Sequence, residues 1–260
     1  YGQRFDSRML RFVRAVTDGR YRYIRNFHPH RSRGIFAGYP HGQVGWQSFL
    51  KLQEAEKLTP IQSGYWDAPQ PTEELYDTQA DPWELKNLAK DHKHKARLDK
   101  MRDATLNKMR EIGDTGIVPE SMYEGISVDS TVYDYVHNKD FPYEDVLKMA
   151  LTAGDGEKKS FRKLRAAMKH EHPVIRYWGA TGCTILGESA SKAQSHLKKL
   201  LKDPSPSVRV AAAEALYVTG DKKAGFQGLL DILKETKDPV VSLEALNITQ
   251  RLGVMSDVPE

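Results

Sequence analysis

Partly alternating apolar and polar residues mark two short segments near the beginning of the chain. These segments, residues 9–17 and 20–27, are rich in β-branched and aromatic side chains, and Asp18-Gly19 lies between them. Such composition and alternation are typical of β-strands. Aspartate followed by glycine suits a two-residue turn whose backbone needs positive φ angles. The pattern therefore predicts a β-hairpin.

The pattern then changes to that of a small mixed unit. Prolines and glycines interrupt residues 28–63 and predict a long loop with short helical pieces. A further short strand is expected at residues 73–76. Asp81 and Pro82 resemble the capped start of a short helical turn. Apolar residues at spacings of three and four predict a longer helix over residues 93–112.

The second half of the chain repeats with a period of 33 residues. The repeated glycines are Gly154, Gly187, Gly220 and Gly253, and the repeated leucines are Leu164, Leu197 and Leu230. Segments that open on Pro173, Pro206 and Pro239 close on the last three glycines. This pattern predicts helix-turn-helix units in which proline opens the first helix and glycine closes it. The proline-valine-arginine openings and alanine-rich helices resemble HEAT repeats.

The repeats should stack, because one short helix pair cannot bury its own apolar stripe. We expect about three and a half units over residues 142–258. The side chains expected to face inward are those of Val174, Ile175, Val208, Val241 and the repeated leucines. Arg176 and Arg209 should lie near the start of their helices and reach carboxylates of an adjacent unit, and Ser242 should end this series.

The predicted fold class is therefore α+β: a small antiparallel sheet with a packed helix, followed by an all-α array of HEAT-like repeats. Residues 114–140 lack clear helical periodicity and predict the crossing between the two parts. We place the first domain at residues 1–125, a linker at 126–140 and the repeats at 141–260. A length of 260 residues suits two modest domains.

Composition excludes several classes of protein. With 39% hydrophobic and 28% charged residues, the chain has the composition of a soluble globular protein. No apolar run is long enough to predict a membrane span. The single cysteine, Cys183, excludes an internal disulfide framework. Its position within an apolar predicted helix indicates core packing.

The positive charge is concentrated at the start of the chain. Residues 1–38 contain nine arginines and two aspartates, whereas the whole chain has a formal charge of +4. Such a patch attracts anions such as sulfated sugars or nucleic acid, unless the arginines only line the solvent face of the hairpin. Tyr21, Tyr23 and Phe27 alternate as strand core does and no nucleic-acid module matches, so we expect no nucleic-acid partner.

Several short motifs occur in order through the first half. They are Arg20-Tyr21-Arg22-Tyr23-Ile24-Arg25-Asn26, Glu74-Leu75-Tyr76-Asp77, Asp81-Pro82-Trp83-Glu84 and Asn87-Leu88-Ala89. Their order and separations resemble the C-terminal signature of type I sulfatases of the alkaline phosphatase superfamily, over about residues 1–122. The resemblance implies hydrolysis of sulfate esters or sulfamates, and it favours a periplasmic or extracellular location.

The resemblance also implies cofactors that this chain does not supply. Sulfatases of this family use a formylglycine, made from a Cys/Ser-x-Pro-x-Arg motif, and a calcium ion held by their large N-terminal domain. That motif does not occur in the 260 residues. We therefore expect no catalytic residue in this chain, and we assign calcium and formylglycine to an N-terminal domain outside it.

The family's C-terminal subdomain closes one side of the substrate cleft. On that analogy, the candidate contacts to a sulfated saccharide are His28, His30, Arg31, Arg33 and His41. Arginine pairs bidentately with sulfate oxygens and histidine donates to them or to hydroxyls. The alternative is a surface loop without a ligand. A metal at the two nearby histidines lacks a recognisable third ligand, so no metal is assigned.

Two functions of different classes follow. The chain is the C-terminal part of a sulfatase that supplies one wall of the cleft for a sulfated saccharide but not the catalytic centre. Alternatively, it is a non-catalytic binding module whose repeats recruit a protein or polysaccharide partner.

Overall fold

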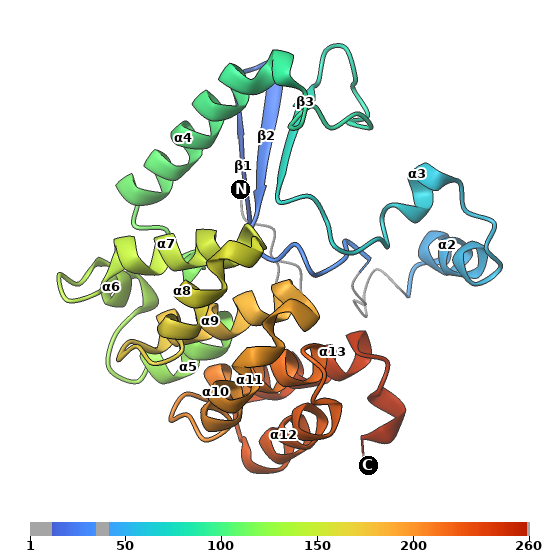
Figure 1. The fold of residues 1–260 in the computed structure, drawn as a ribbon. Helices are drawn as coiled ribbons and strands as arrows, with labels where there is room; N and C mark the ends of the chain where they lie inside the picture. The colour runs from blue at the N-terminus through green and yellow to red at the C-terminus, as the bar shows by residue number, and fades with distance from the viewer. Residues whose placement is uncertain (1–11, 35–41, 259–260) are drawn as a thin grey trace. The chain divides into compact units, whose positions relative to one another are not determined.

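The computed structural model describes residues 12–34 and 42–258 of the chain. The chain divides into two compact units, Tyr1–Met109 and Arg110–Glu260 (Figure 1). The first contains a three-stranded sheet and the second consists of helices. This confirms the α+β class, with a small antiparallel sheet ahead of a helical array. None of the described helices has the length and apolar character needed to cross a bilayer.

The predicted hairpin is present as β1 (Val13–Thr17) and β2 (Tyr21–Asn26), and β3 (Glu73–Asp77) pairs antiparallel with β2. The turn lies one residue later than predicted, because Thr17 pairs with Arg22 and Asp18 N donates to Tyr21 O at 3.2 Å, so the chain reverses at Gly19-Arg20. The side chain of Asp18 accepts hydrogen bonds from the backbone nitrogens of Arg20 at 3.1 Å and Tyr21 at 2.7 Å. This carboxylate therefore holds the two backbone nitrogens that follow Gly19.

Helix α4 (Lys95–Glu111) covers one face of the sheet, as the spacing of its apolar residues predicts (Figure 1). The core between them consists of Tyr21, Tyr23, Leu75, Leu98 and Met101. At its edge, Arg102 on α4 donates to both carboxylate oxygens of Glu73 on β3 at 2.6 Å, and the Tyr23 hydroxyl donates to the same carboxylate at 2.6 Å. A charged contact thus fixes the helix along the strand.

Two local expectations in this unit are wrong. The helical turn expected after Asp81 is an irregular turn, in which the Asp81 carboxylate accepts from Lys86 N at 2.8 Å. The Asn87 side chain accepts from Leu75 N at 3.0 Å and donates to Glu73 O at 3.1 Å, which holds the segment against β3 instead of in a helix. The glycine-rich region also contains the eleven-residue helix α2 (Val44–Glu54), followed by α3 (Pro60–Ser63).

The second unit consists of helix pairs in the predicted register. Its longer helices are α7 (Tyr143–Gly154), α8 (Phe161–Ala167), α9 (Pro173–Leu186), α10 (Gln194–Leu200), α11 (Pro206–Val218), α12 (Lys222–Glu235) and α13 (Pro239–Arg251). Proline opens α9, α11 and α13, and Gly187, Gly220 and Gly253 follow them with positive φ. After α7, Gly156 takes this role instead of Gly154.

The inward face is predicted correctly, with one exception. The four valine and isoleucine side chains and two of the leucines, Leu164 and Leu197, are at most 2% exposed. Leu230 is only half-buried, because its neighbour Leu229 takes the core position in α12. The register of the apolar face therefore shifts by one residue in the last helix pair.

Residues 110–140 belong by their packing to the second unit. They contain the short elements η2 (Thr115–Ile117), η3 (Glu120–Met122), α5 (Tyr123–Ile126) and α6 (Val132–His137). We call residues 115–126 the covering segment. The backbone oxygen of Ile117 accepts from Trp178 Nε1 on α9 at 2.9 Å, and η3 contacts α11 and α13.

The covering segment therefore lies over the first helices of the repeats, although the sequence was interpreted there as the end of the first domain and a linker. The limits 1–125, 126–140 and 141–260 stay a prediction about independently folding parts. The two units defined by packing meet at Met109–Arg110.

Burial makes Leu197 a test of the inward face. Leu197→Ala should lower the free energy of unfolding of the second unit by about 2–5 kcal/mol, because it removes a fully buried side chain and leaves a cavity. Urea unfolding followed by circular dichroism measures this. Leu85→Ala, at a position 57% exposed in the first unit, is the matched control and should change little. Equal stability of the two variants would contradict the assigned inward face.

The two repeat arginines should differ in their effect. Arg176 binds both oxygens of Asp203 at 2.7 and 2.8 Å, and the Asp203 side chain is 4% exposed. Arg209 binds Glu235 at 2.5 Å, but that carboxylate is 60% exposed. Arg176→Ala should cost about 3–5 kcal/mol by leaving a buried carboxylate unpaired, and Arg209→Ala about 0–1 kcal/mol. Equal losses in urea unfolding would show that burial does not decide the outcome.

Candidate functional site

The loop that follows β2 contains the predicted saccharide contacts. His28 and Arg31 are buried, whereas His30 and Arg33 are half-buried. The rings of His28 and His30 meet edge to face with centroids 5.7 Å apart, and Arg31 N donates to His28 O at 3.1 Å. His41 lies outside the described residues. The loop thus brings the two histidines together, but both ring nitrogens of His30 are buried, and Arg33 is the more accessible predicted contact.

Hydrogen bonds from the strand ends give His28 a structural position. Its Nδ1 accepts from Phe12 N at 3.3 Å, and its backbone nitrogen donates to Asn26 Oδ1 at 3.2 Å. An accepting Nδ1 places the proton of a neutral imidazole on Nε2. The ring of Phe12, the residue that donates to His28, stacks on the ring of Phe27 with centroids 4.2 Å apart. His28 therefore closes the end of the hairpin.

The far side of the loop is held by the α2–α3 region. Gly34 N donates to Tyr65 O at 3.0 Å, and Gln70 N donates to Pro29 O at 2.7 Å. A Cβ at position 34 would lie 1.9 Å from the Trp66 ring, so this position requires glycine. The rings of Trp46, Phe49, Tyr65 and Trp66 form a cluster beside it.

Arg33 is oriented by a buried carboxylate. Its Nη2 donates to Glu74 Oε2 at 2.5 Å, and the Tyr76 hydroxyl donates to the same oxygen. Burial lowers the pKa of Arg33, but the hydrogen bond to Glu74, the charge of Glu74 and the effects of Tyr76 together outweigh it, so the pKa lies above its ordinary value. Burial, and then the hydrogen bond to Glu74, raise the pKa of Tyr76. Arg33 is therefore a cation that its ion pair with Glu74 holds in one position.

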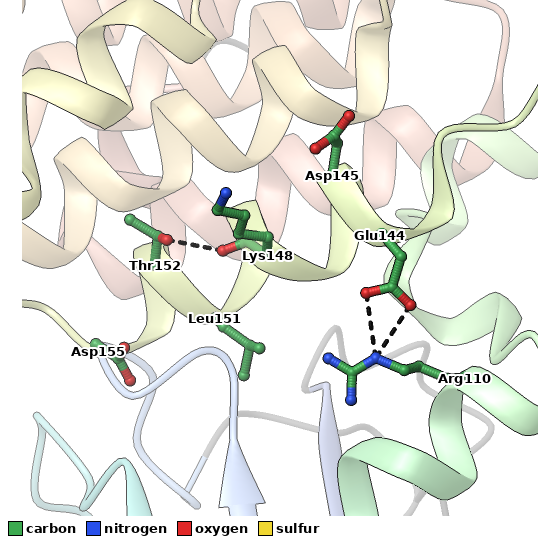
Figure 2. A pocket seen from close by; sticks show the side chains of 7 residues that line it. All are labelled: Arg110, Glu144, Asp145, Lys148, Leu151, Thr152 and Asp155. Atoms are coloured by element: carbon green, nitrogen blue, oxygen red, sulfur yellow. Dashed lines mark hydrogen bonds and ion pairs between the residues drawn. The ribbon is translucent and has the colours of Figure 1, made fainter.

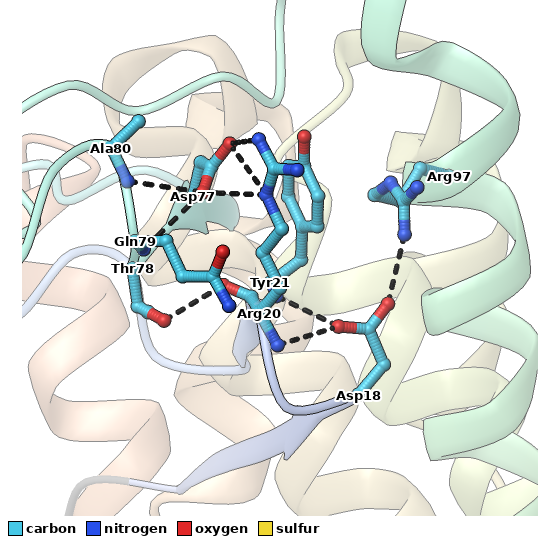
Figure 3. Close-up of polar contacts among 8 residues, drawn as sticks. All are labelled: Asp18, Arg20, Tyr21, Asp77, Thr78, Gln79, Ala80 and Arg97. Carbon is cyan, nitrogen blue, oxygen red and sulfur yellow. Dashed lines mark hydrogen bonds and ion pairs between the residues drawn. The ribbon is translucent and has the colours of Figure 1, made fainter.

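A second carboxylate network holds the opposite end of the sheet (Figure 3). Asp77 accepts from Arg20 Nε at 3.0 and 3.1 Å and from Arg20 Nη2 at 2.6 Å. These hydrogen bonds are the main reason that the pKa of Asp77 lies well below its usual range. Asp18 also has a lowered pKa, chiefly through the backbone nitrogens of Tyr21 and Arg20, with a smaller contribution from Arg97.

Several arginines at the start of the chain take part in ion pairs or are buried. Among the described residues, Arg20, Arg22 and Arg33 pair with Asp77, Glu84 and Glu74 respectively. Arg25 and Arg31 are buried. The positive patch expected from residues 1–38 is thus partly neutralised by carboxylates on β3 and just beyond it.

Sequence interpretation missed these partners, although a signal for them exists. The strand Glu73–Asp77 carries three carboxylates, and its antiparallel partner β2 carries arginines. The register pairs Arg25 with Glu73 and places Arg22 opposite Tyr76. Opposite charges on facing strands favour pairing, so the two charge patterns taken together predict part of the network.

A separate hollow of about 420 Å³ lies on the second unit (Figure 2). It is lined by Arg110, Glu144, Asp145, Lys148, Leu151, Thr152 and Asp155. Arg110 Nε donates to both oxygens of Glu144, at 3.0 and 3.1 Å, so these two charges form an ion pair. Its mixed charges favour no single ligand chemistry, and none of the predicted contacts lies in it.

The single cysteine belongs to the core of the second unit. Cys183 is fully buried in α9, and burial raises the pKa of its thiol to about 12. A protonated, inaccessible thiol does not act as a nucleophile, which agrees with core packing. Within the described residues, no group of three or more His, Cys, Asp or Glu side chains is arranged to hold a metal ion.

Comparison with known proteins first defines the class of the second unit. A family model described as HEAT repeats matches residues 161–247. This is the region of helices α8 to α13, and the match confirms the repeat class predicted from the 33-residue period.

A curated protein then gives the relationship of a further part of the chain. Over 118 residues the chain is 35% identical to the Ulvan-active sulfatase of Formosa agariphila. The match covers 45% of this chain and 20% of that protein, so the chain spans about one fifth of the length of its relative. No solved structure matches the chain. The chain therefore combines a sulfatase-related region with HEAT repeats.

The two carboxylates of Figure 3 should respond differently to loss of an arginine. Arg20→Ala should raise the pKa of Asp77 toward its ordinary value, because the arginine is the main cause of the lowering. Arg97→Ala should raise the pKa of Asp18 only slightly, because backbone donors dominate there. Carboxyl-carbon NMR titration measures both.

The sign of the linked stability follows from the lowered pKa. Asp77 contributes stability above the pKa of an unfolded aspartate and loses it as the pH falls through the lower folded value. An unchanged Asp77 titration in Arg20→Ala would contradict the assignment of the ion pair as its cause.

Proposed function

We propose that this chain is the C-terminal portion of a sulfatase that hydrolyses sulfate esters or sulfamates of a sulfated carbohydrate. The observation that carries the proposal is the 35% identity, over 118 residues, with a sulfatase named for activity on ulvan. The ordered motifs on β2, on β3 and at residues 81–89 support the same conclusion.

In this proposal the loop after β2 supplies one wall of the substrate cleft. Arg33 has the chemistry for a sulfate contact, since a guanidinium pairs with two oxygens of a tetrahedral anion. Glu74 and Tyr76 hold it in place before a ligand arrives. Both ring nitrogens of His30 are buried, so its contact to the saccharide stays a prediction, and His28 and Arg31 support the loop from within. His41 stays a predicted contact.

The bond-breaking chemistry is assigned to a region outside this chain. The described residues do not fit a calcium site, and the 260 residues lack the motif that yields formylglycine. The role of these residues is therefore to bind and orient the saccharide. A polymeric substrate is met outside the cytoplasm, which supports the proposal of a periplasmic or extracellular location.

A second candidate function rests on the HEAT match. Helical repeats form extended binding surfaces, so a binding module that recruits a protein or polysaccharide is the alternative. The two functions can occur in one protein.

The test uses the protein encoded by the complete reading frame, compared with the 260-residue chain. The complete protein should release sulfate from ulvan oligosaccharides, and the 260-residue chain should show no turnover, even of an aryl sulfate. Arg33→Ala in the complete protein should raise KM for the oligosaccharide by about tenfold, the loss expected for one charged contact. It should leave turnover of the aryl sulfate nearly unchanged.

Arg97→Ala is the matched control, because Arg97 also pairs with a carboxylate of the first unit but lies on α4. It should leave both substrates unaffected. A reading frame without the Cys/Ser-x-Pro-x-Arg motif, or an inactive complete protein, would overturn the enzymatic proposal. Equal effects of the two arginine variants would overturn the assigned cleft wall.

A further inference from the structure

The strongest unbalanced charge of the described chain lies on the repeats. Residues 157–202 contain eleven Lys and Arg side chains but only three Glu and no Asp. One of the eleven, Arg176, is used in the inter-repeat ion pair with Asp203. The other ten are solvent-exposed and lie on or beside the second helices, α8 and α10.

Six of these cations occupy matched positions in two successive repeats. Lys159, Arg165 and Lys169 in the first are followed 33 residues later by Lys192, Lys198 and Lys202 in the second. We call these six residues the cationic ladder. The buried leucines Leu164 and Leu197 are spaced in the same way, so the two helices turn equivalent faces outward. Helix α8 packs on α9, α10 packs on α11, and α9 and α11 pack on each other, so the ladder presents rows of positive charge on two neighbouring helix pairs.

The environment of His196 provides independent evidence that the rows converge. Burial lowers the pKa of His196, and the cations Lys169, Arg165 and Lys199 lower it further. Two of these three cations come from the α8 side and the third from α10. Positive charges of neighbouring repeats therefore act on one imidazole.

Little of this charge is neutralised within the described part of the chain. Lys159 pairs with Glu157 at 3.0 Å and Lys198 with Asp221 at 2.7 Å. The other four members of the ladder, Arg165, Lys169, Lys192 and Lys202, make no ion pair with the residues that the structure describes. This contrasts with the first unit, where Arg20, Arg22 and Arg33 are paired.

The opposite face of the repeats is already occupied. The covering segment lies over the first helices, with Trp178 Nε1 donating to Ile117 O at 2.9 Å and η3 in contact with α11 and α13. The second helices thus present the face that an external partner can reach.

We propose that the cationic ladder binds a linear sulfated polysaccharide and holds the polymer on the protein. Two rows of cations fit a chain of regularly spaced anionic groups better than a compact ligand, which would contact one row. The polymer's class rests on the proposed function, whereas the anionic chemistry rests on the ladder itself. Single-stranded nucleic acid is disfavoured because it needs stacking aromatics, and α8 and α10 contain only one, Phe161, with Arg165 over its ring at 5.9 Å.

The test measures binding of the 260-residue chain to dextran sulfate and to ulvan, with uncharged dextran as the reference polymer. Binding should require sulfate and weaken steeply with added salt, because binding releases counterions from the polymer. Replacing Arg165, Lys169, Lys192 and Lys202 with Ala should raise Kd by about tenfold or more. The pair Lys169→Ala and Lys202→Ala should give an intermediate loss.

The matched control removes the same charge elsewhere. Lys86, Lys90, Lys93 and Lys100 are exposed lysines of the first unit, and their replacement with Ala should change Kd by less than about twofold. Equal weakening of polymer binding by both quadruple variants would show that only the net charge matters. That result would contradict binding at the cationic ladder. So would tighter binding of a DNA duplex than of the sulfated polymers, or equal binding of dextran.

The outcome is separable from that of the proposed function. Loss of polymer binding in the ladder variants with an inactive complete protein would remove the sulfatase assignment alone. Sulfatase activity together with unaffected binding in the ladder variants would remove the ladder alone.

Discussion

The first helices of the repeats need apolar neighbours on more than one side, and the second unit is organised around that need. Every residue from Tyr177 to Thr184 in α9 and from Val210 to Leu216 in α11 is buried. Most of these residues are apolar, and the charged Glu214 in α11 pairs with Arg251. A helix buried around its whole circumference is stable only inside a core. The second helices cover one side, and the covering segment contributes contacts on another through Ile117 and η3. This division leaves the charged side chains to the second helices.

The first unit differs from the second in that many arginines surround a small sheet. The strand β3 provides carboxylates that pair with these arginines. Glu73 ties α4 to the sheet through Arg102, Glu74 holds Arg33, and Asp77 binds Arg20. The arginines therefore serve mainly to join elements. In the repeats, by contrast, four cations of the ladder point to an external anion.

The sequence predicts the structure correctly wherever a periodic pattern of apolar residues reflects burial. The 33-residue period predicted the helix pairs, their opening prolines and the fully buried Leu197. It failed where side-chain hydrogen bonds replaced periodicity. Asn87 holds residues 81–89 against β3, and Asp18 binds backbone nitrogens of the hairpin turn. Neither contact leaves a period in the sequence.

The candidate site was only partly predictable for the same reason. Residue type identified His30 and Arg33, but the carboxylate that fixes Arg33 lies 41 residues away on another strand. The sequence did not predict that residues 110–140 pack with the repeats, because the covering segment contributes isolated apolar side chains such as Ile117 and Met122. Isolated contacts of this kind gain meaning only when a partner such as Trp178 is known.

The ion pair between Arg176 and Asp203 also bears on how the array unfolds. Arg176 donates to the backbone oxygens of His170 and Glu171 in the turn before α9, and Asp203 accepts from Ser205 N in the turn before α11. One guanidinium therefore joins two successive inter-helix turns. Repeat arrays with weak interfaces lose their units one at a time from the ends. Here, opening either turn breaks a buried contact of the other, so we expect the two repeats to unfold together.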